Sequence, residues 1–152
     1  MTQITDVTEE YKNIANPEDG ILAFQDGYEQ ESHADEIETA RWLYKTFGGN
    51  LILLRESQRQ GVKTTDYLWN DRLWERKGIS SNKYGTIDLR IRKAYGQIME
   101  KRGGIVLDFS ACRLRMEKII SYTTKSLKER AHGQTDVIIK HGSSYKVLRA
   151  KK

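Results

Sequence analysis

Three charged residues, Asp66, Glu75 and Lys77, have types and spacing that suit phosphate or metal chemistry. They lie in the stretch from Thr64 to Gly78, where TTDYLW and RLWERK flank Asn70-Asp71. The β-branched and aromatic residues predict two strands, and Asn and Asp tolerate the positive φ of a tight hairpin turn. With a two-residue turn, Asp66 lies opposite Glu75, and Lys77 shares their face. Facing carboxylates destabilise a sheet unless they are neutralised, and a divalent cation with oxygen ligands does this.

A solvated hairpin, in which Lys77 pairs with Glu75 or Asp66, is the alternative. It explains the charges but not why they share a face with Leu68 and Leu73. The apolar neighbours therefore favour a site over a solvated surface.

Glu36 is expected to approach the same face from a helix. Residues 31–47 have helical spacing of apolar side chains, end at a Gly-Gly pair, and begin with Ser32 and Asp35, which resemble a capping box. The helical wheel places Glu36 near the middle of the apolar stripe, with His33 beside it. An inward carboxylate is costly unless it is paired or bound to a cation. The alternative is a solvated carboxylate favoured by the helix dipole.

The other apolar patterns predict an α/β domain that positions these residues. Short apolar runs between turn signals predict strands, and longer runs with helical periodicity predict helices. In chain order these are strands at 21–24 and 50–56, the hairpin, a helix at 86–101, a strand at 104–110, a helix at 113–130 and a C-terminal strand, turn and strand. We expect a central mixed β-sheet flanked by helices, with residues 21–152 as one domain and residues 1–20 as a loosely held acidic arm.

Charge is distributed unevenly along the chain. The net charge of +5 combines −6 over the first 30 residues with +11 over the remainder. A basic body attracts polyanions by phosphate neutralisation and counterion release, although ordinary solubility charge has the same composition. The candidate nucleic-acid contacts are Lys83, Arg90, Lys93 and Arg113.

Composition disfavours several other classes of protein. No apolar run is long enough for a membrane span, and the N-terminus lacks the basic and apolar regions of a signal peptide. The single Cys112 excludes an internal disulfide and a cysteine-based zinc site.

The arrangement of these residues resembles the PD-(D/E)XK nuclease superfamily. Asp66 is followed nine residues later by Glu75-Arg76-Lys77, after a helix with an inward Glu36, and Thr65 stands where the motif usually has proline. Residues 20–110 are also similar to nuclease domains at the C-termini of bacterial contact-dependent growth inhibition toxins, with related domains on phage and mobile-element proteins. This resemblance implies a core with the element order α-β-β-β-α-β.

The resemblance also implies a metal-dependent nuclease. Asp66 and Glu75 would bind a divalent ion, Mg²⁺ in the first place and Mn²⁺ or Zn²⁺ as alternatives, and Glu36 would complete the shell directly or through water. Lys77 would stabilise the pentavalent phosphate or help to position and deprotonate the attacking water. Gln97 matches a helix position that contacts the site in such nucleases.

The toxin similarity favours tRNA over DNA as substrate. It further implies an acidic immunity protein as partner, and action in the bacterial cytoplasm after delivery within a larger secreted or phage protein. Two alternatives stay open. A metal-independent RNase of the barnase, EndoU, colicin or RelE kind would use His33, Thr86, Arg90 or His132 for acid–base catalysis. A non-catalytic nucleic-acid-binding phage module would use only the basic body.

Overall fold

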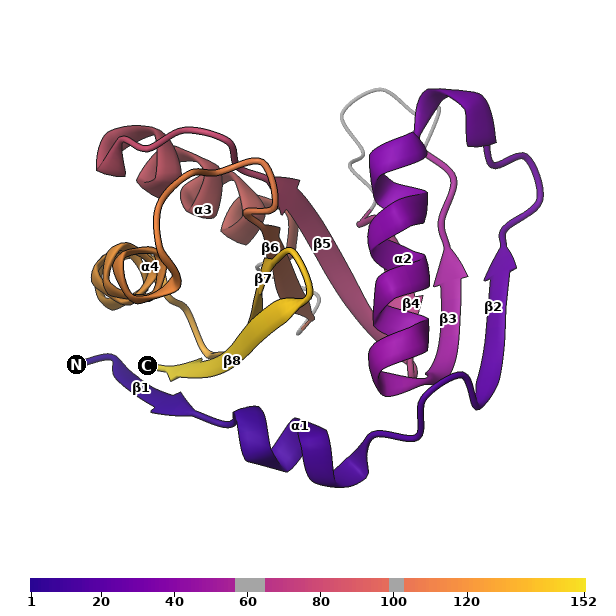
Figure 1. Ribbon diagram of the computed structural model, residues 1–152, viewed down its shortest axis with the longest axis horizontal. Coiled ribbons are helices and arrows are strands. Elements are labelled where there is room, and N and C mark those ends of the chain that lie inside the picture. The colour runs from indigo at the N-terminus through magenta and orange to yellow at the C-terminus, as the bar shows by residue number, and fades with distance from the viewer. Residues whose placement is uncertain (57–64, 99–102) are drawn as a thin grey trace.

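A mixed β-sheet organises the chain, as the computed structural model of residues 1–56, 65–98 and 103–152 shows (Figure 1). Its eight strands in these residues are β1 (Gln3–Asp6), β2 (Gly20–Phe24), β3 (Gly49–Leu53), β4 (Tyr67–Trp69), β5 (Arg72–Gly78), β6 (Gly104–Asp108), β7 (Gln134–His141) and β8 (Ser144–Lys151). Their order in the sheet is β1-β8-β7-β6-β5-β4-β3-β2. The helices are α1 (Thr8–Ile14), α2 (Ala34–Phe47), α3 (Tyr84–Ile98) and α4 (Met116–Arg130), with a 3₁₀ turn, η1, at Gln30–Ser32.

The strand directions confirm the predicted mixed sheet flanked by helices. Strands β5, β6 and β7 run parallel to one another, as do β2 and β3, whereas the remaining neighbours are antiparallel. Parallel neighbours require crossover connections, which α2, α3 and α4 supply. No helix in the described parts of the chain is both long and apolar enough to cross a membrane.

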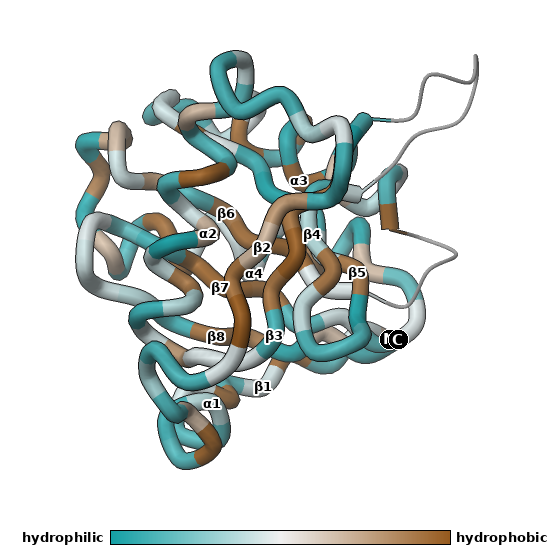
Figure 2. Tube along the Cα trace, turned by 90° about the vertical axis from the view of Figure 1, so that its right-hand side faces the viewer, coloured by the Kyte–Doolittle hydropathy of each residue, from teal (hydrophilic) through white to brown (hydrophobic). Residues whose placement is uncertain are grey.

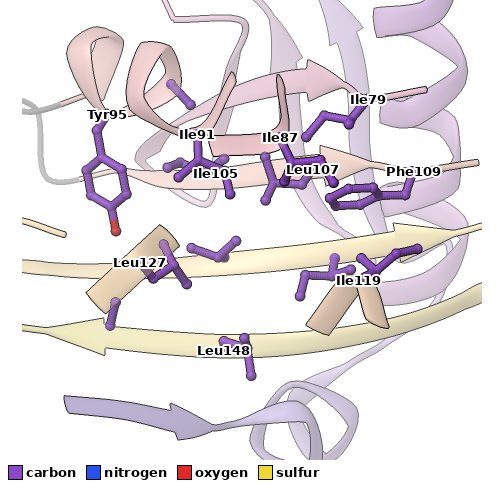
Figure 3. Packing of buried hydrophobic residues seen from close by; sticks show 14 of the residues in the cluster. Ile79, Ile87, Ile91, Tyr95, Ile105, Leu107, Phe109, Ile119, Leu127 and Leu148 are labelled. Atoms are coloured by element: carbon purple, nitrogen blue, oxygen red, sulfur yellow. The ribbon is translucent and has the colours of Figure 1, made fainter. Parts of the chain in front are cut away.

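The two faces of the sheet carry separate cores. Along β6, Ile105 and Leu107 point into the core beneath α3 and α4, whereas Val106 points into the core that α1 and α2 cover. Figure 3 shows Ile87, Ile91 and Tyr95 of α3 packed over β6 in the first core. In Figure 2 the hydrophobic segments follow the interior strands and the hydrophilic ones follow the outer loops. Each buried Ile or Leu contributes roughly 1.5–3 kcal/mol to folding.

The hairpin has the predicted register. Asn70 and Asp71 form its turn with φ of 49° and 64°, and positive φ at both positions is the geometry of a type I′ turn. The ladder ends at Tyr67, so Asp66 lies just beyond β4, where it accepts a hydrogen bond of 2.8 Å from the backbone N–H of Arg76. The cross-strand pairs are Tyr67–Trp74, Leu68–Leu73 and Trp69–Arg72.

The first 20 residues differ from the expected loosely held arm. Strand β1 pairs with β8 at the edge of the sheet, and α1 buries Tyr11 in the core beneath α2. The hydroxyl of Tyr11 donates a hydrogen bond to Asp136, and Glu10 pairs with Arg149. These partners lie more than 100 residues away in the sequence, so a local composition rich in acids gave no sign of them.

The helix boundaries required smaller corrections. Helix α2 begins at Ala34, because residues 30–32 form η1, and Ser32 donates to the carboxylate of Glu29 instead of forming the predicted capping box. Helix α3 begins at Tyr84 rather than at Thr86, and α4 begins at Met116. Thr64 and the predicted last residues of the second helix, 99–101, lie outside the described residues.

Candidate active site

The predicted acidic residues meet at the open end of the hairpin. Asp66 lies before β4, Glu75 lies on β5, and Glu36 lies in the first turn of α2. The carboxyl group of Asp66 lies close enough to those of Glu36 and Glu75 for charge repulsion to raise pKa values in the group. The hydroxyl of Tyr67 donates a 2.6 Å hydrogen bond to the backbone carbonyl of Glu36, which ties the start of α2 to β4. The local structure therefore brings three carboxyl groups from three segments together.

The same three carboxyl groups have raised pKa values. Burial, followed by repulsion from Asp66, raises the pKa of Glu36 to about 7. Burial, followed by repulsion from Glu75, raises the pKa of Asp66 to about 7. Burial also raises the pKa of Glu75, although Lys77 opposes this shift. Neighbouring buried carboxylates repel one another, so ionising them together is costly. A bound cation would stabilise their ionised forms.

Lys77 and Gln97 flank Glu75 on the face of the sheet that α3 covers. Glu75 and Lys77 pair with Ile105 and Leu107 of β6, so they share a face with the core beneath α3. The Nζ atom of Lys77 lies 3.3 Å from Oε2 of Glu75. Burial raises the pKa of Glu75, and both Lys77 and Gln97 oppose that rise. Lys77 thus pairs with Glu75, and the catalytic roles of these two residues, Gln97, Asp66 and Glu36 stay predictions.

Two buried oxygens in this group have no hydrogen-bond partner among the described residues. They are Oε1 of Glu75 and Oε1 of Gln97. A buried acceptor without a donor costs free energy, which a cation or an ordered water would recover.

The donor set fits a hard divalent cation with few protein ligands. Among residues 1–56, 65–98 and 103–152, no group of three or more histidine, cysteine, aspartate or glutamate side chains is arranged to hold a metal ion. A closed cage of three carboxylates is therefore not preformed. Mg²⁺ commonly binds through one or two carboxylates and keeps several waters, and Asp66 with Glu75 matches that requirement.

Two further side chains contact Glu36: His33, which the helical wheel already placed beside it, and Tyr28, which the sequence did not indicate. The hydroxyl of Tyr28 donates a 2.9 Å hydrogen bond to Oε2 of Glu36, and burial is the main cause of the raised pKa of this tyrosine. The ring of His33 packs against Tyr28, and its Nδ1 lies 3.6 Å from Oε1 of Glu36. Tyr28 lies outside any periodic pattern, eight residues before Glu36, so the sequence carries no signal for this contact.

The predicted nucleic-acid contacts lie on the surface of the protein. Lys83, Arg90, Lys93 and Arg113 are all exposed. Arg90 lines a pocket at the carboxyl ends of β5 and β6, together with Arg76 and Lys140, and the other three do not line it. Nucleic-acid contacts of Lys83, Lys93 and Arg113 stay predictions.

The residues of the metal-independent alternative are dispersed. His132 packs near Tyr95 and lines a pocket with Gly103, whereas Arg90 lines the separate pocket beside β5. His33 lies at the carboxylate cluster. Thr86 lies one turn before Arg90 on α3, whereas His33 and His132 lie elsewhere, so the four candidates do not form one acid–base group.

Comparison with known proteins gives one structural neighbour. No family model matches the chain, and neither does any curated protein. The fold is similar to that of a chain in the CdiA-CT/CdiI toxin and immunity complex from Burkholderia pseudomallei, with a TM-score of 0.56 and 13% sequence identity over 82% of this chain and 97% of that chain. At this level of identity the likeness shows a shared α/β fold.

Proposed function

We propose that the protein is a metal-dependent nuclease of the PD-(D/E)XK type that acts as a toxin domain and cleaves tRNA. The observation that carries the proposal is the convergence of Glu36, Asp66 and Glu75 beside Lys77, with a buried oxygen of Glu75 lacking a partner. A structural ion pair would not leave a surplus of buried carboxyl groups.

Each residue has a distinct role in this proposal. Asp66 and Glu75 would hold a divalent ion, Mg²⁺ or alternatively Mn²⁺ or Zn²⁺, and Glu36 would reach it directly or through water. When bound, such an ion polarises the phosphodiester and lowers the pKa of a water molecule. Lys77 donates hydrogen bonds to the phosphate oxygens and stabilises the charge that develops on them.

Glu36 is also suited to proton transfer. Its pKa of about 7 allows it to accept a proton from water near neutral pH. The hydrogen bond from Tyr28 fixes the orientation of its carboxylate from outside the reacting centre.

The structural neighbour supports the assignment to a toxin. That protein is described as a toxin and immunity complex, and a buried carboxylate–lysine group suits a catalytic component better than a binding component. By analogy, we expect a cognate immunity protein that is acidic, because the body of this chain is basic. We also expect delivery into target bacteria within a larger secreted or phage protein, and action in their cytoplasm.

The proposal is tested by incubating the purified protein with total tRNA and with plasmid DNA, in Mg²⁺ or in EDTA. We expect cleavage of tRNA in Mg²⁺ only, and none by the Glu75→Gln or Lys77→Ala variants. A Glu117→Gln variant, which alters an exposed acid at the start of α4, should cleave normally.

Each contrary result has a defined meaning. Cleavage that survives both site variants, or that continues undiminished in EDTA, overturns the mechanism. A 2′,3′-cyclic phosphate product formed in EDTA indicates a metal-independent RNase. Salt-sensitive binding without cleavage of any nucleic acid indicates a non-catalytic binding module.

A further inference from the structure

A pocket of about 460 Å³ lies beside the candidate active site, where β5 and β6 end. Arg76, Arg90 and Lys140 contribute positive charge to its lining, and Asp35 and Glu38 of α2 contribute negative charge. The carboxyl ends of parallel strands are common places for ligands in α/β sheets, and the volume falls in the usual range for ligand pockets.

The inner part of the pocket is a built polar cluster rather than a solvated surface. Lys140 is only 7% exposed, and its Nζ donates a 2.8 Å hydrogen bond to Oγ of Ser110. Asp108 lies 3.8 Å from this Nζ and 3.2 Å from the guanidinium of Arg76. Hydrogen bonds from Ser110 and the two cations hold the pKa of Asp108 below its ordinary value, although burial opposes them.

The charges of this cluster do not balance. The side chains of Arg76 and Lys140 share one ionised carboxylate, Asp108, which leaves one surplus positive charge in the inner part. An ammonium group has three donors, and Lys140 makes one hydrogen bond among the described residues. Arg90 adds a further exposed cation to the lining. This end of the pocket is therefore suited to a phosphate group.

The pocket lies next to the candidate active site along β5. Arg76 lies between Glu75 and Lys77 on β5, and its backbone N–H donates to Asp66. Gly78, which lines the pocket, is three residues beyond Glu75, or about 10 Å at the usual rise of a strand. A nucleic-acid strand bound at Glu75 therefore brings a neighbouring nucleotide to the pocket.

We propose that this pocket binds one nucleotide next to the scissile bond and selects it. Its phosphate lies against Lys140 and Arg90, and its base amino group or 2′-hydroxyl faces Asp35 and Glu38. Carboxylates accept hydrogen bonds from exocyclic amino groups, and single-stranded RNA exposes both kinds of donor. The inference rests on the proposed nuclease function and adds to it the subsite that reads the substrate.

Binding of RNA is measured first, by fluorescence anisotropy with a labelled single-stranded RNA and the Glu75→Gln protein in Mg²⁺ at several salt concentrations. Added Arg90→Gln or Lys140→Gln changes should each weaken binding about 5–10-fold and reduce the salt slope by about one. Lys128→Gln, which removes the same charge from the outer side of α4, should change affinity less than twofold. Equal effects of Arg90→Gln and Lys128→Gln overturn the proposal.

Selectivity is measured second, by sequencing the cut ends that active protein produces. A Glu38→Gln change should alter the base preference at one position beside the cut, and an unchanged preference contradicts the assignment of this side chain. The binding measurement tests whether the pocket contributes to RNA binding even if no cleavage is found. Conversely, if cleavage depends on Glu75 but the Arg90→Gln and Lys140→Gln changes do not weaken binding, the proposed subsite is wrong and the proposed nuclease function still holds. Because Lys140 is buried, Arg90→Gln decides the binding measurement if the Lys140 variant does not fold.

Discussion

Two groups of buried acids in this protein are held in opposite ways. Asp136 is 1% exposed, and it accepts hydrogen bonds from Arg149, at 2.7 and 3.0 Å, and from the hydroxyl of Tyr11. Burial by itself would raise the pKa of Asp136, but these partners keep it below its ordinary value. Burial and neighbouring carboxylates raise the pKa of Asp66 to about 7 instead.

The difference separates a structural acid from a functional one. The chain supplies the cation for Asp136, and the resulting network joins α1, β7 and β8. In the cluster of Glu36, Asp66 and Glu75, the described residues place Lys77 beside Glu75 and His33 beside Glu36, but they give Asp66 no salt bridge. The cluster is therefore left to bind a cation from outside. A cavity beside a buried acid does not show that the acid is functional. A cavity of about 240 Å³ also borders Asp136, whose charge is already paired with Arg149.

The largest expected effect is on catalysis at the unpaired cluster. Glu75→Gln should reduce cleavage at least about 10³-fold, or about 4 kcal/mol in the activation barrier, because a metal ligand is lost. The thermal midpoint should stay the same or rise, since a buried repulsive charge is removed. Activity and thermal unfolding are measured on the same preparation. A midpoint that falls together with activity would place Glu75 among the structural acids.

The corresponding change at the paired cluster should have the opposite outcome. Asp136→Asn should lower the free energy of unfolding by about 3 kcal/mol, because Arg149 loses its buried ionised partner. The rate of cleavage per folded molecule should not change. Urea unfolding at pH 7 and cleavage assays measure the two quantities. Loss of cleavage without loss of stability would show that Asp136 takes part in the chemistry.

The two clusters should also respond oppositely to pH. Glu36 and Asp66 have pKa values of about 7 when folded and lower values when unfolded, so the folded state binds more protons between pH 5 and 8. Their contribution to stability is full below the unfolded pKa values and is lost as the pH rises through 7.

In EDTA, the free energy of unfolding should therefore fall by about 5 kcal/mol from pH 5 to pH 8, about half of it from each carboxyl group. The Glu36→Gln, Asp66→Asn double variant should lack this fall. Asp136 has a lowered pKa, so the stability it contributes should be lost only as the pH falls below about 4. Thermal unfolding from below pH 4 up to pH 8 measures both effects. Parallel pH profiles for the wild type and the double variant would contradict the raised pKa values.

The smallest expected effect concerns the turn that sets the hairpin register. Asp71 has φ of 64°, where glycine is less strained, so Asp71→Gly should stabilise the fold by about 0.5 kcal/mol. Cleavage should be unchanged, because the alignment of β4 with β5 is kept. Loss of activity in a stably folded Asp71→Gly protein would show that the turn contributes more than register.

The sequence was most informative where local pattern and turn chemistry agree. Asn70 and Asp71 specified a two-residue turn, and the alternation of TTDYLW and RLWERK then determined the pairing of Tyr67 with Trp74. The alternation also placed Glu75 and Lys77 on one face. A prediction based on period-two alternation succeeds here because a slip of one residue would expose Trp69 and Trp74, which are buried.

The contacts that sequence reasoning missed are those between distant segments. Tyr11 and Asp136 are 125 residues apart, and Arg76 meets Asp108 and Thr39 across the ends of β5, β6 and α2. None of these pairs leaves a periodic signal. The acids near the N-terminus suggested disorder because their partners, Arg149 and Lys146, lie at the other end of the chain.

A calorimetric titration of the metal-free protein with Mn²⁺ at pH 7, repeated in buffers with different ionisation enthalpies, tests the central claim most directly. Glu36 and Asp66 each have a pKa of about 7, so each is about half protonated at that pH. A cation bound by Asp66 and Glu75 favours the ionised form of Asp66 and of the neighbouring Glu36, and should displace about one proton in total. We expect Mn²⁺ to bind with release of about one proton, and we expect Asp66→Asn to abolish binding. Binding without proton release, binding that survives Asp66→Asn, or no binding at all would contradict a metal site at this cluster.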